Sequence, residues 1–227
     1  KIISISNLPS YNKKEINYLY LNIKKSNNSF FKINEDEDKE HIDIVYKEND
    51  NSTFKFSNKR QPLHTDYAYS QREDGMIQCA FMYNIESSKI GGYTTFLDSE
   101  KLVNILKQYD LKLYEKLIIH EVKFNKDVTF NIKKSYKTSK IITKLKNKQH
   151  IINWNYYRYS KNNTEEVIKL CEEFHFFLEE YIVNGCNFDL IYSWNKGDCV
   201  FWNDSSVIHG RSSFIGNRHL VKSGISI

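Results

Sequence analysis

The stretch Gln61-Pro62-Leu63-His64-Thr65-Asp66 places an imidazole and a carboxylate two residues apart. Side chains at i and i+2 of an extended segment project to the same side, so both groups can reach one ion. A second stretch far along the chain, Asp204-Ser205-Ser206-Val207-Ile208-His209-Gly210-Arg211, offers another imidazole from a different strand. Two histidines and one carboxylate on one face of a metal, with the opposite face open, form the site used for non-haem Fe(II) chemistry. The sequence therefore predicts a metal site at His64, Asp66 and His209.

Two further features give this triplet its context. An H-x-D triplet alone is common, and a lone histidine is more often an ordinary core or surface residue than a ligand. Arg218 follows His209 at a distance suited to a cation that reaches a second carboxylate near the metal. Between the two stretches, Gly91-Gly92-Tyr93-Thr94 predicts a turn that delivers a hydroxyl. Together these pieces are far more specific than any one of them.

The order and approximate spacing of three motifs carry a resemblance. They are Leu63-His64-Thr65-Asp66, Gly91-Gly92-Tyr93-Thr94 and His209-Gly210-Arg211-Ser212-Ser213-Phe214. In these the chain resembles the Fe(II)/2-oxoglutarate-dependent dioxygenases of the taurine dioxygenase and clavaminate synthase-like superfamily, from about Phe54 to the C-terminus. The stretches Gly216–Leu220 and Ile152–Arg158 most resemble γ-butyrobetaine and trimethyllysine hydroxylases.

The resemblance implies an enzyme that uses Fe(II), 2-oxoglutarate and O2. His64, Asp66 and His209 would hold the iron and carry catalysis, and 2-oxoglutarate would chelate it through its keto-acid end. Arg218 would pair with the distal carboxylate, because a planar guanidinium suits bidentate recognition, and Thr94 would donate a hydrogen bond. The cosubstrate would leave as succinate and CO2. Since related halogenases carry a small residue in place of Asp66, hydroxylation is favoured over halogenation, while desaturation and ring closure stay open.

The expected partner is a small-molecule substrate, amino-acid-like or betaine-like, with a peptidyl or natural-product intermediate as the alternative. By resemblance, Asn155 and Arg158 lie on a segment that contacts polar groups of the substrate, although Arg158 could equally form a structural ion pair. Tyr67 could line the pocket, where aromatic faces favour an ammonium group. Arg211 either supports the site electrostatically or belongs to the scaffold behind it.

Two other classes of protein remain as alternatives. One is a jelly-roll binding protein that has lost turnover, but the joint presence of His64, Asp66, His209 and Arg218 argues against it. The other is a zinc hydrolase with the same three ligands. It would need a general base such as the glutamate of H-E-x-x-H, and it would have no use for Arg218.

The pattern of apolar residues predicts a mainly β fold, a double-stranded β-helix (jelly roll) with flanking α-helices, in a single domain spanning residues 1–227. Alternation indicates a strand at 41–46, and a dense apolar run indicates one at 76–83. Short segments at hairpin spacing indicate strands at 189–193, 198–202, 206–209 and 218–225. Helical spacing indicates helices at 13–25, 99–109, 111–118 and 163–181. In the last of these, Asn163 is the expected N-cap, because Glu166 follows three residues later. His175 lies off its apolar stripe, and His219 should point away from the site.

Composition bounds the remaining possibilities. The formal net charge is +5, and seven lysines gather between Lys133 and Lys148 without stacking aromatics. We therefore expect no nucleic-acid partner, and a solvated loop there, with a lid over the site as a hypothesis. The four cysteines show no C-x-x-C spacing and have apolar neighbours, which predicts buried free thiols and a cytoplasmic protein. No stretch is long and apolar enough to predict a membrane partner.

Overall fold

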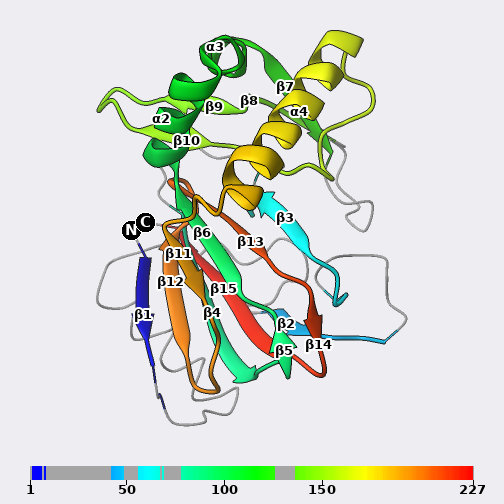
Figure 1. Cartoon of the computed structure of the whole chain (residues 1–227), viewed down its shortest axis with the longest axis vertical. Helices are drawn as coiled ribbons and strands as arrows, with labels where there is room; N and C mark the ends of the chain where they lie inside the picture. Colours follow the sequence, from blue (N-terminus) through cyan, green and yellow to red (C-terminus); the bar gives the residue numbers. More distant parts are fainter. Residues whose placement is uncertain are drawn as a thin grey trace.

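Two antiparallel sheets form the body of the molecule in the computed structural model, which describes residues 2–6, 8, 42–48, 56–66, 68, 78–125 and 136–226 (Figure 1). The larger sheet has the strand order β1-β12-β4-β15-β2 and the smaller sheet the order β11-β6-β13-β3. The strands of the larger sheet are β1 (Ile2–Ile5), β12 (Cys199–Asn203), β4 (Gln78–Glu86), β15 (His219–Ser226) and β2 (Ile42–Val45). Those of the smaller sheet are β11 (Leu190–Tyr192), β6 (Thr94–Asp98), β13 (Val207–Arg211) and β3 (Gln61–His64).

The alternation of side chains along β12 explains how the larger sheet is buried on both faces. Val200 and Trp202 pack with Phe96 and Val207 of the smaller sheet, in the apolar layer between the two sheets. Cys199 points to the other face, where it packs with further buried residues. Successive side chains of a strand point to opposite faces, so one strand can serve both layers. The mainly β fold with a few helices expected from the sequence is confirmed.

A helical layer covers one end of the sandwich, in the upper part of Figure 1. It contains α2 (Ser99–Tyr109), α3 (Leu111–Ile119) and α4 (Glu165–Phe177), which continues into the π-helical turn η1 (Leu178–Asn184). Two short hairpins complete it: β7 (Glu121–Asn125) with β8 (Tyr136–Lys140), and β9 (Ile142–Lys144) with β10 (His150–Ile152). Its core is continuous with Leu63, Leu97 and Ile208 from the smaller sheet. The strands that carry the predicted ligands are therefore anchored at this end.

A glycine turn between β4 and β6 fixes the approach to Thr94. Gly91, in the two-residue strand β5 (Ile90–Gly91), has φ +73°, and a Cβ there would lie 2.2 Å from the Ser213 carbonyl oxygen. This close approach lets β5 pair with β14 (Phe214–Ile215) and lets the Gly92 amide donate to Ser213, at 3.1 Å. Only glycine accepts both the conformation and the contact without strain.

The predicted N-cap of α4 was wrong by one residue. Thr164 is the cap, and its hydroxyl accepts a hydrogen bond from the Val167 amide. The Asn163 side chain instead accepts from the Lys123 amide at 2.8 Å and donates to the Lys123 carbonyl at 3.1 Å, which ties the loop to β7. Both residue types cap helices well, so local sequence alone could not separate them.

Two other expectations are corrected by the structure. The lysine-rich segment is a loop only in part, because residues 136–140 and 142–144 form β8 and β9, while residues 145–148 form the turn that leads to β10. Cys186 is exposed, whereas Cys171 and Cys199 are buried free thiols as expected. The helix expected at residues 13–25 lies outside the described residues. Among the residues that are described, no helix has the length and apolar character needed to cross a membrane.

Candidate metal centre

The predicted ligands come together where β3 meets β13. His64 and His209 are direct partners across the two strands, with their ring centroids 4.4 Å apart. Asp66 follows β3 by two residues and reaches the same point. One ligand atom from each of the three side chains lies within 4.8 Å of the others. The i, i+2 spacing and the strand pairing thus place all three groups around one position.

A hydrogen bond of His64 determines which nitrogen of that ring faces this position. His64 Nδ1 lies 2.9 Å from the Pro62 carbonyl oxygen, which can only accept, so Nδ1 carries the proton and Nε2 has the free lone pair. His64 Nε2 and His209 Nε2 each lie 3.6 Å from an oxygen of the Asp66 carboxylate. The amide of Gln61 also lies 3.1 Å from His64 Nε2 and has to turn aside for a metal to bind there.

The electrostatics of the site favour the ionisation states that metal binding requires. Burial would raise the pKa of Asp66, but the nearby Lys222 and His209 outweigh this effect and hold the pKa well below its usual value. Burial lowers the pKa of His209 well below its ordinary value, despite the attraction of Asp66. A charged carboxylate and neutral imidazoles are the forms that bind metal. Among the described residues, the buried Asp66 Oδ2 also has no hydrogen-bond partner, so this donor set fits a divalent ion.

Two residues beside the ligands were missed by sequence reasoning. The Lys222 ammonium forms an ion pair with Asp66 Oδ1. The fully buried Asp204 accepts a hydrogen bond from the Asp66 amide at 3.2 Å and lies 3.7 Å from His209 Nδ1. A signal for Lys222 existed, because it follows Arg218 by four residues and an even spacing keeps both on one face of a strand. Asp204 stands in the second motif, but nothing local shows which groups it faces.

A second cationic region lies around Phe214. The guanidinium carbons of Arg211 and Arg218 lie 5.1 and 5.6 Å from the Phe214 ring centroid. Both side chains are buried, and burial lowers the pKa of Arg211 to about 10 and, together with the charge of Arg211, that of Arg218 to about 9. Arg211 donates through Nη2 to the carbonyls of Ser57 and Lys59, at 2.8 and 2.6 Å. Arg218 has no carboxylate partner among the described residues.

Thr94 lies on β6 directly opposite Arg211 of β13. Its hydroxyl is buried and accepts a hydrogen bond from Trp194 Nε1 at 2.8 Å. Because the acceptor side of this hydroxyl is used, its own proton is left to donate to a ligand. The turn expected from Gly91-Gly92-Tyr93-Thr94 therefore delivers a hydroxyl into the interior of the sandwich.

The predicted substrate segment borders the metal ligands through its backbone. The Thr65 amide donates to the Trp154 carbonyl at 2.7 Å, and the Trp154 amide lies 3.2 Å from Thr65 Oγ1. Asn155 follows Trp154, and its side chain accepts from the Tyr157 amide, while its carbonyl accepts from the Arg158 amide. Tyr67 lies outside the described residues.

His175 and His219, which the sequence predicts to be outside the site, lie away from the candidate ligands. His219 pairs with Asp43, at 2.8 Å between Nε2 and Oδ1, as expected for the opposite face of β15. His175 stacks on Tyr156, with ring centroids 3.8 Å apart, and makes no contact with the candidate ligands.

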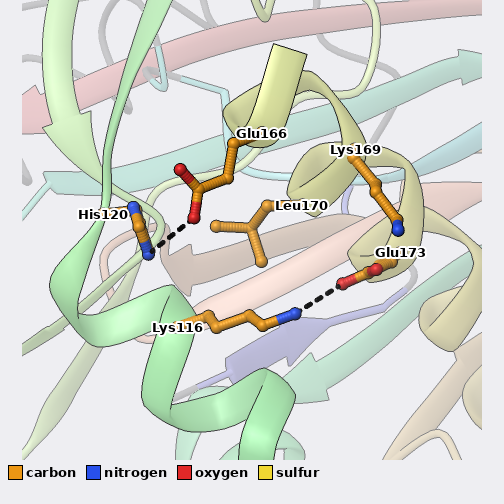
Figure 2. Close-up of a pocket in the computed structure, with 6 residues that line it drawn as sticks. All are labelled: Lys116, His120, Glu166, Lys169, Leu170 and Glu173. Carbon is orange, nitrogen blue, oxygen red and sulfur yellow. Dashed lines mark hydrogen bonds and ion pairs between the residues drawn. The ribbon is translucent and has the colours of Figure 1, made fainter. Parts of the chain in front are cut away.

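A shallow pocket between α3 and α4 contains none of the candidate ligands (Figure 2). It is lined by Lys116, His120, Glu166, Lys169, Leu170 and Glu173. Lys116 pairs with Glu173 at 3.3 Å, and His120 lies 4.0 Å from Glu166. These contacts join the two helices across the surface.

A two-sheet β fold that holds two histidines and one carboxylate around an open position defines the class of non-haem iron oxygenases. The chain belongs to the TauD/TfdA family, described as taurine catabolism dioxygenase, whose sequence model matches residues 2–223. This is a family of Fe(II)- and 2-oxoglutarate-dependent oxygenases, and the three candidate ligands of this chain match the donor set that such chemistry needs.

Several solved structures share the fold at low identity. PvcB from Pseudomonas aeruginosa, an Fe, alpha-ketoglutarate dependent oxygenase from an isonitrile synthetic pathway, is 16% identical with a TM-score of 0.65, over 98% of this chain and 74% of its own. AAD-2, solved with Mn(II) and N-oxalylglycine, is 10% identical with a TM-score of 0.69, over 99% and 82%.

An asparagine oxygenase, solved with Fe(II), 2S,3S-3-hydroxyasparagine and succinate, is 10% identical with a TM-score of 0.63. The match covers 81% of this chain but only 55% of the asparagine oxygenase, so the chain spans about half the length of that protein. A search of curated proteins found no match.

Proposed function

We propose that His64, Asp66 and His209 hold Fe(II), and that the enzyme hydroxylates a small amino-acid-like or betaine-like substrate with release of succinate and CO2. One observation carries the metal assignment. Both Nε2 atoms lie 3.6 Å from the oxygens of one carboxylate that is 11% exposed. When bound, iron together with 2-oxoglutarate and O2 supplies the oxidising power, and the chain's own residues bind and orient the reactants.

Arg218 is the proposed partner of the distal carboxylate of 2-oxoglutarate, with Thr94 donating a hydrogen bond. Arg218 is a buried guanidinium without a carboxylate partner in the part of the chain that the structure describes, and an anionic ligand would offset the cost of burying its charge. Its planar fork suits two parallel hydrogen bonds to a carboxylate. Thr94 lies opposite Arg211, whose guanidinium packs on the Phe214 ring as that of Arg218 does. This position supports the proposal that Thr94 and Arg218 bind the same carboxylate.

Asn155, Arg158, Tyr67 and Arg211 are the proposed substrate-binding residues. The backbone contacts between Thr65 and Trp154 support a role for the Asn155–Arg158 segment, since they hold it beside the ligand loop. The hydrogen bonds of Arg211 to two backbone carbonyls favour the scaffold alternative for that residue.

The hydroxyasparagine in the asparagine oxygenase structure supports an amino-acid-like substrate. None of the relatives described above is a γ-butyrobetaine or trimethyllysine hydroxylase, so a betaine-like substrate rests on the sequence motifs alone. PvcB belongs to an isonitrile synthetic pathway, which supports a natural-product intermediate as the alternative substrate of this chain. A single domain over residues 1–227 and a cytoplasmic location are part of the same proposal.

An anaerobic titration with Fe(II) and 2-oxoglutarate, followed by visible absorption, tests the proposal directly. Chelation of ferrous iron by the 2-oxo acid should produce a weak charge-transfer band. His64→Ala should abolish the band, and Arg218→Ala should shift its half-saturation to higher 2-oxoglutarate. Lys101→Ala is the matched control. It removes the ion pair of Lys101 on α2 with Asp189, which is 3.2 Å long, and should leave the band unchanged.

The absence of a band in folded, iron-loaded protein would contradict the proposed site. If the band forms, amino acids and betaines can be compared by the succinate that each releases under O2. Turnover confined to larger natural-product intermediates would favour the alternative substrate class.

A further inference from the structure

Lys222 brings a second cation to the carboxylate that the metal needs. It lies on β15, where it pairs with Met82 of β4 and Ile42 of β2 within the larger sheet. Asp66 follows β3 of the smaller sheet, so the Lys222–Asp66 ion pair crosses the layer between the sheets. The two side chains are 14% and 11% exposed, which limits screening of the pair by water.

The ion pair and the metal would share one carboxylate. Lys222 contacts Asp66 Oδ1, the same oxygen that lies 3.6 Å from His64 Nε2. Asp66 Oδ2 lies 3.6 Å from His209 Nε2, so a divalent ion between the histidines must bind the carboxylate that the ammonium touches. Like charges a few ångströms apart repel strongly where the local dielectric is low.

Of the two cations that would share Asp66, the Lys222 ammonium can move away, because it is carried by a flexible side chain. The lysine ammonium is a compact point charge on four methylene groups, so it can move away while Asp66 stays in place. The candidate ligands are held more firmly. His64 Nδ1 is hydrogen-bonded to the Pro62 carbonyl, and the Asp66 amide donates a hydrogen bond to Asp204 Oδ1.

We propose that Lys222 is a counter-ion of Asp66 that competes with the divalent metal. The ammonium stabilises the charged carboxylate in the metal-free protein and lowers the affinity of the site for metal. Binding of the metal displaces the ammonium from Oδ1. Lys222 is therefore a positioning residue, and the inference rests on the proposed metal site.

The test compares metal-free wild type with Lys222→Met, Lys222→Arg and Lys101→Met. Cobalt(II) is the probe, titrated without 2-oxoglutarate and followed by its visible absorption, with folding checked by circular dichroism. Lys222→Met should bind Co(II) at least tenfold more tightly than wild type and should unfold at a lower temperature without metal. Lys222→Arg keeps the charge and should stay within about threefold of wild type. Lys101→Met removes another Lys–Asp pair, one that contacts no candidate ligand, and should leave Co(II) affinity unchanged.

The outcomes separate this inference from the proposed metal site. Co(II) affinity in Lys222→Met that equals or falls below that of wild type would overturn the competition while leaving the metal site intact. Failure of wild type to bind Co(II) at all would overturn both. If Lys222→Met does not fold, Lys222→Gln serves the same comparison with a shorter neutral side chain.

Discussion

At the scale of single residues, Asp204 connects two of the three candidate ligands. Its Oδ1 accepts from the Asp66 amide at 3.2 Å and lies 3.7 Å from His209 Nδ1. The indole of Trp202 donates to the same oxygen at 3.4 Å. The distance to His209 Nδ1 is too long for a hydrogen bond, so Asp204 acts on this ring only through its charge. Its hydrogen bond to the Asp66 amide supports the site without making Asp204 a ligand itself.

We expect Asp204→Ala to weaken divalent metal binding by roughly 10- to 100-fold, the range known for residues that support metal ligands. Asp204→Asn should lose less, because its amide oxygen can still accept from the Asp66 amide. Titration of the folded variants with Co(II) measures both effects. Asp189→Ala is the matched control, since Asp189 also accepts from a backbone amide, that of Asp98, at 2.6 Å. Wild-type affinity in Asp204→Ala would show that the contact is only structural.

At the scale of elements, Thr164 begins the helix that covers the end of the sandwich. Its hydroxyl satisfies the Val167 amide, one of the donors that lacks a partner in the first turn of α4. Thr164→Ala should lower the free energy of unfolding by about 1 kcal/mol, whereas Thr164→Ser should be close to neutral. Urea unfolding measures the difference. Equal stability of the alanine and serine variants would argue against the cap.

The junction of α2 with β10 should depend on pH. Glu100 accepts from the His150 amide at 2.5 Å and lies 2.8 Å from His150 Nδ1. Burial alone would raise the pKa of Glu100, but these hydrogen bonds outweigh it, so the pKa is lowered. A carboxyl group with a lowered pKa in the folded state adds stability above its unfolded value of about 4.3, and this stability is lost as the pH falls through the folded value.

Glu100→Gln should therefore melt below wild type at pH 7, with a gap that narrows as the pH falls below about 4. Because the side chain is 36% exposed, water screens the interaction, and we expect no more than about 1 kcal/mol at neutral pH. Melting temperatures of both proteins between pH 7 and 3.5 test this. If the difference in melting temperature stays constant over that range, the effect comes from packing and not from the charge of Glu100.

At the scale of the whole molecule, the metal centre should stabilise the folded state. β13, β3 and the residues that directly follow β3 bring the candidate ligands together only when the smaller sheet has formed. A ligand that binds only the folded state adds about 2.7 kcal/mol at a concentration 100 times its dissociation constant. Metal should therefore raise the melting temperature of the chelator-treated protein, and 2-oxoglutarate should add to the increase only when metal is present. The same increase in Asp66→Ala would place the metal elsewhere.

The three candidate ligands could be predicted because their arrangement is mainly local. The i, i+2 spacing brings His64 and Asp66 to one side, and the strand around His209 can be inferred from the hairpin spacing of the short segments near the C-terminus. The buried stripe of α4 follows from helical spacing for the same reason, as the burial of Leu170 and Phe174 shows. The choice of Thr164 over Asn163 as cap was not local, because it depended on the contact of Asn163 with β7.

The fold class and the candidate donor set could be read from the amino-acid sequence, because both follow from the spacing of polar and apolar side chains along short segments. Three contacts could be seen only in the folded chain: Lys222 reaches Asp66, Asp204 lies 3.7 Å from His209, and Arg211 donates to two backbone carbonyls. Such contacts join residues on different elements. They depend on strand register and on how the two sheets close over each other, which no local pattern encodes.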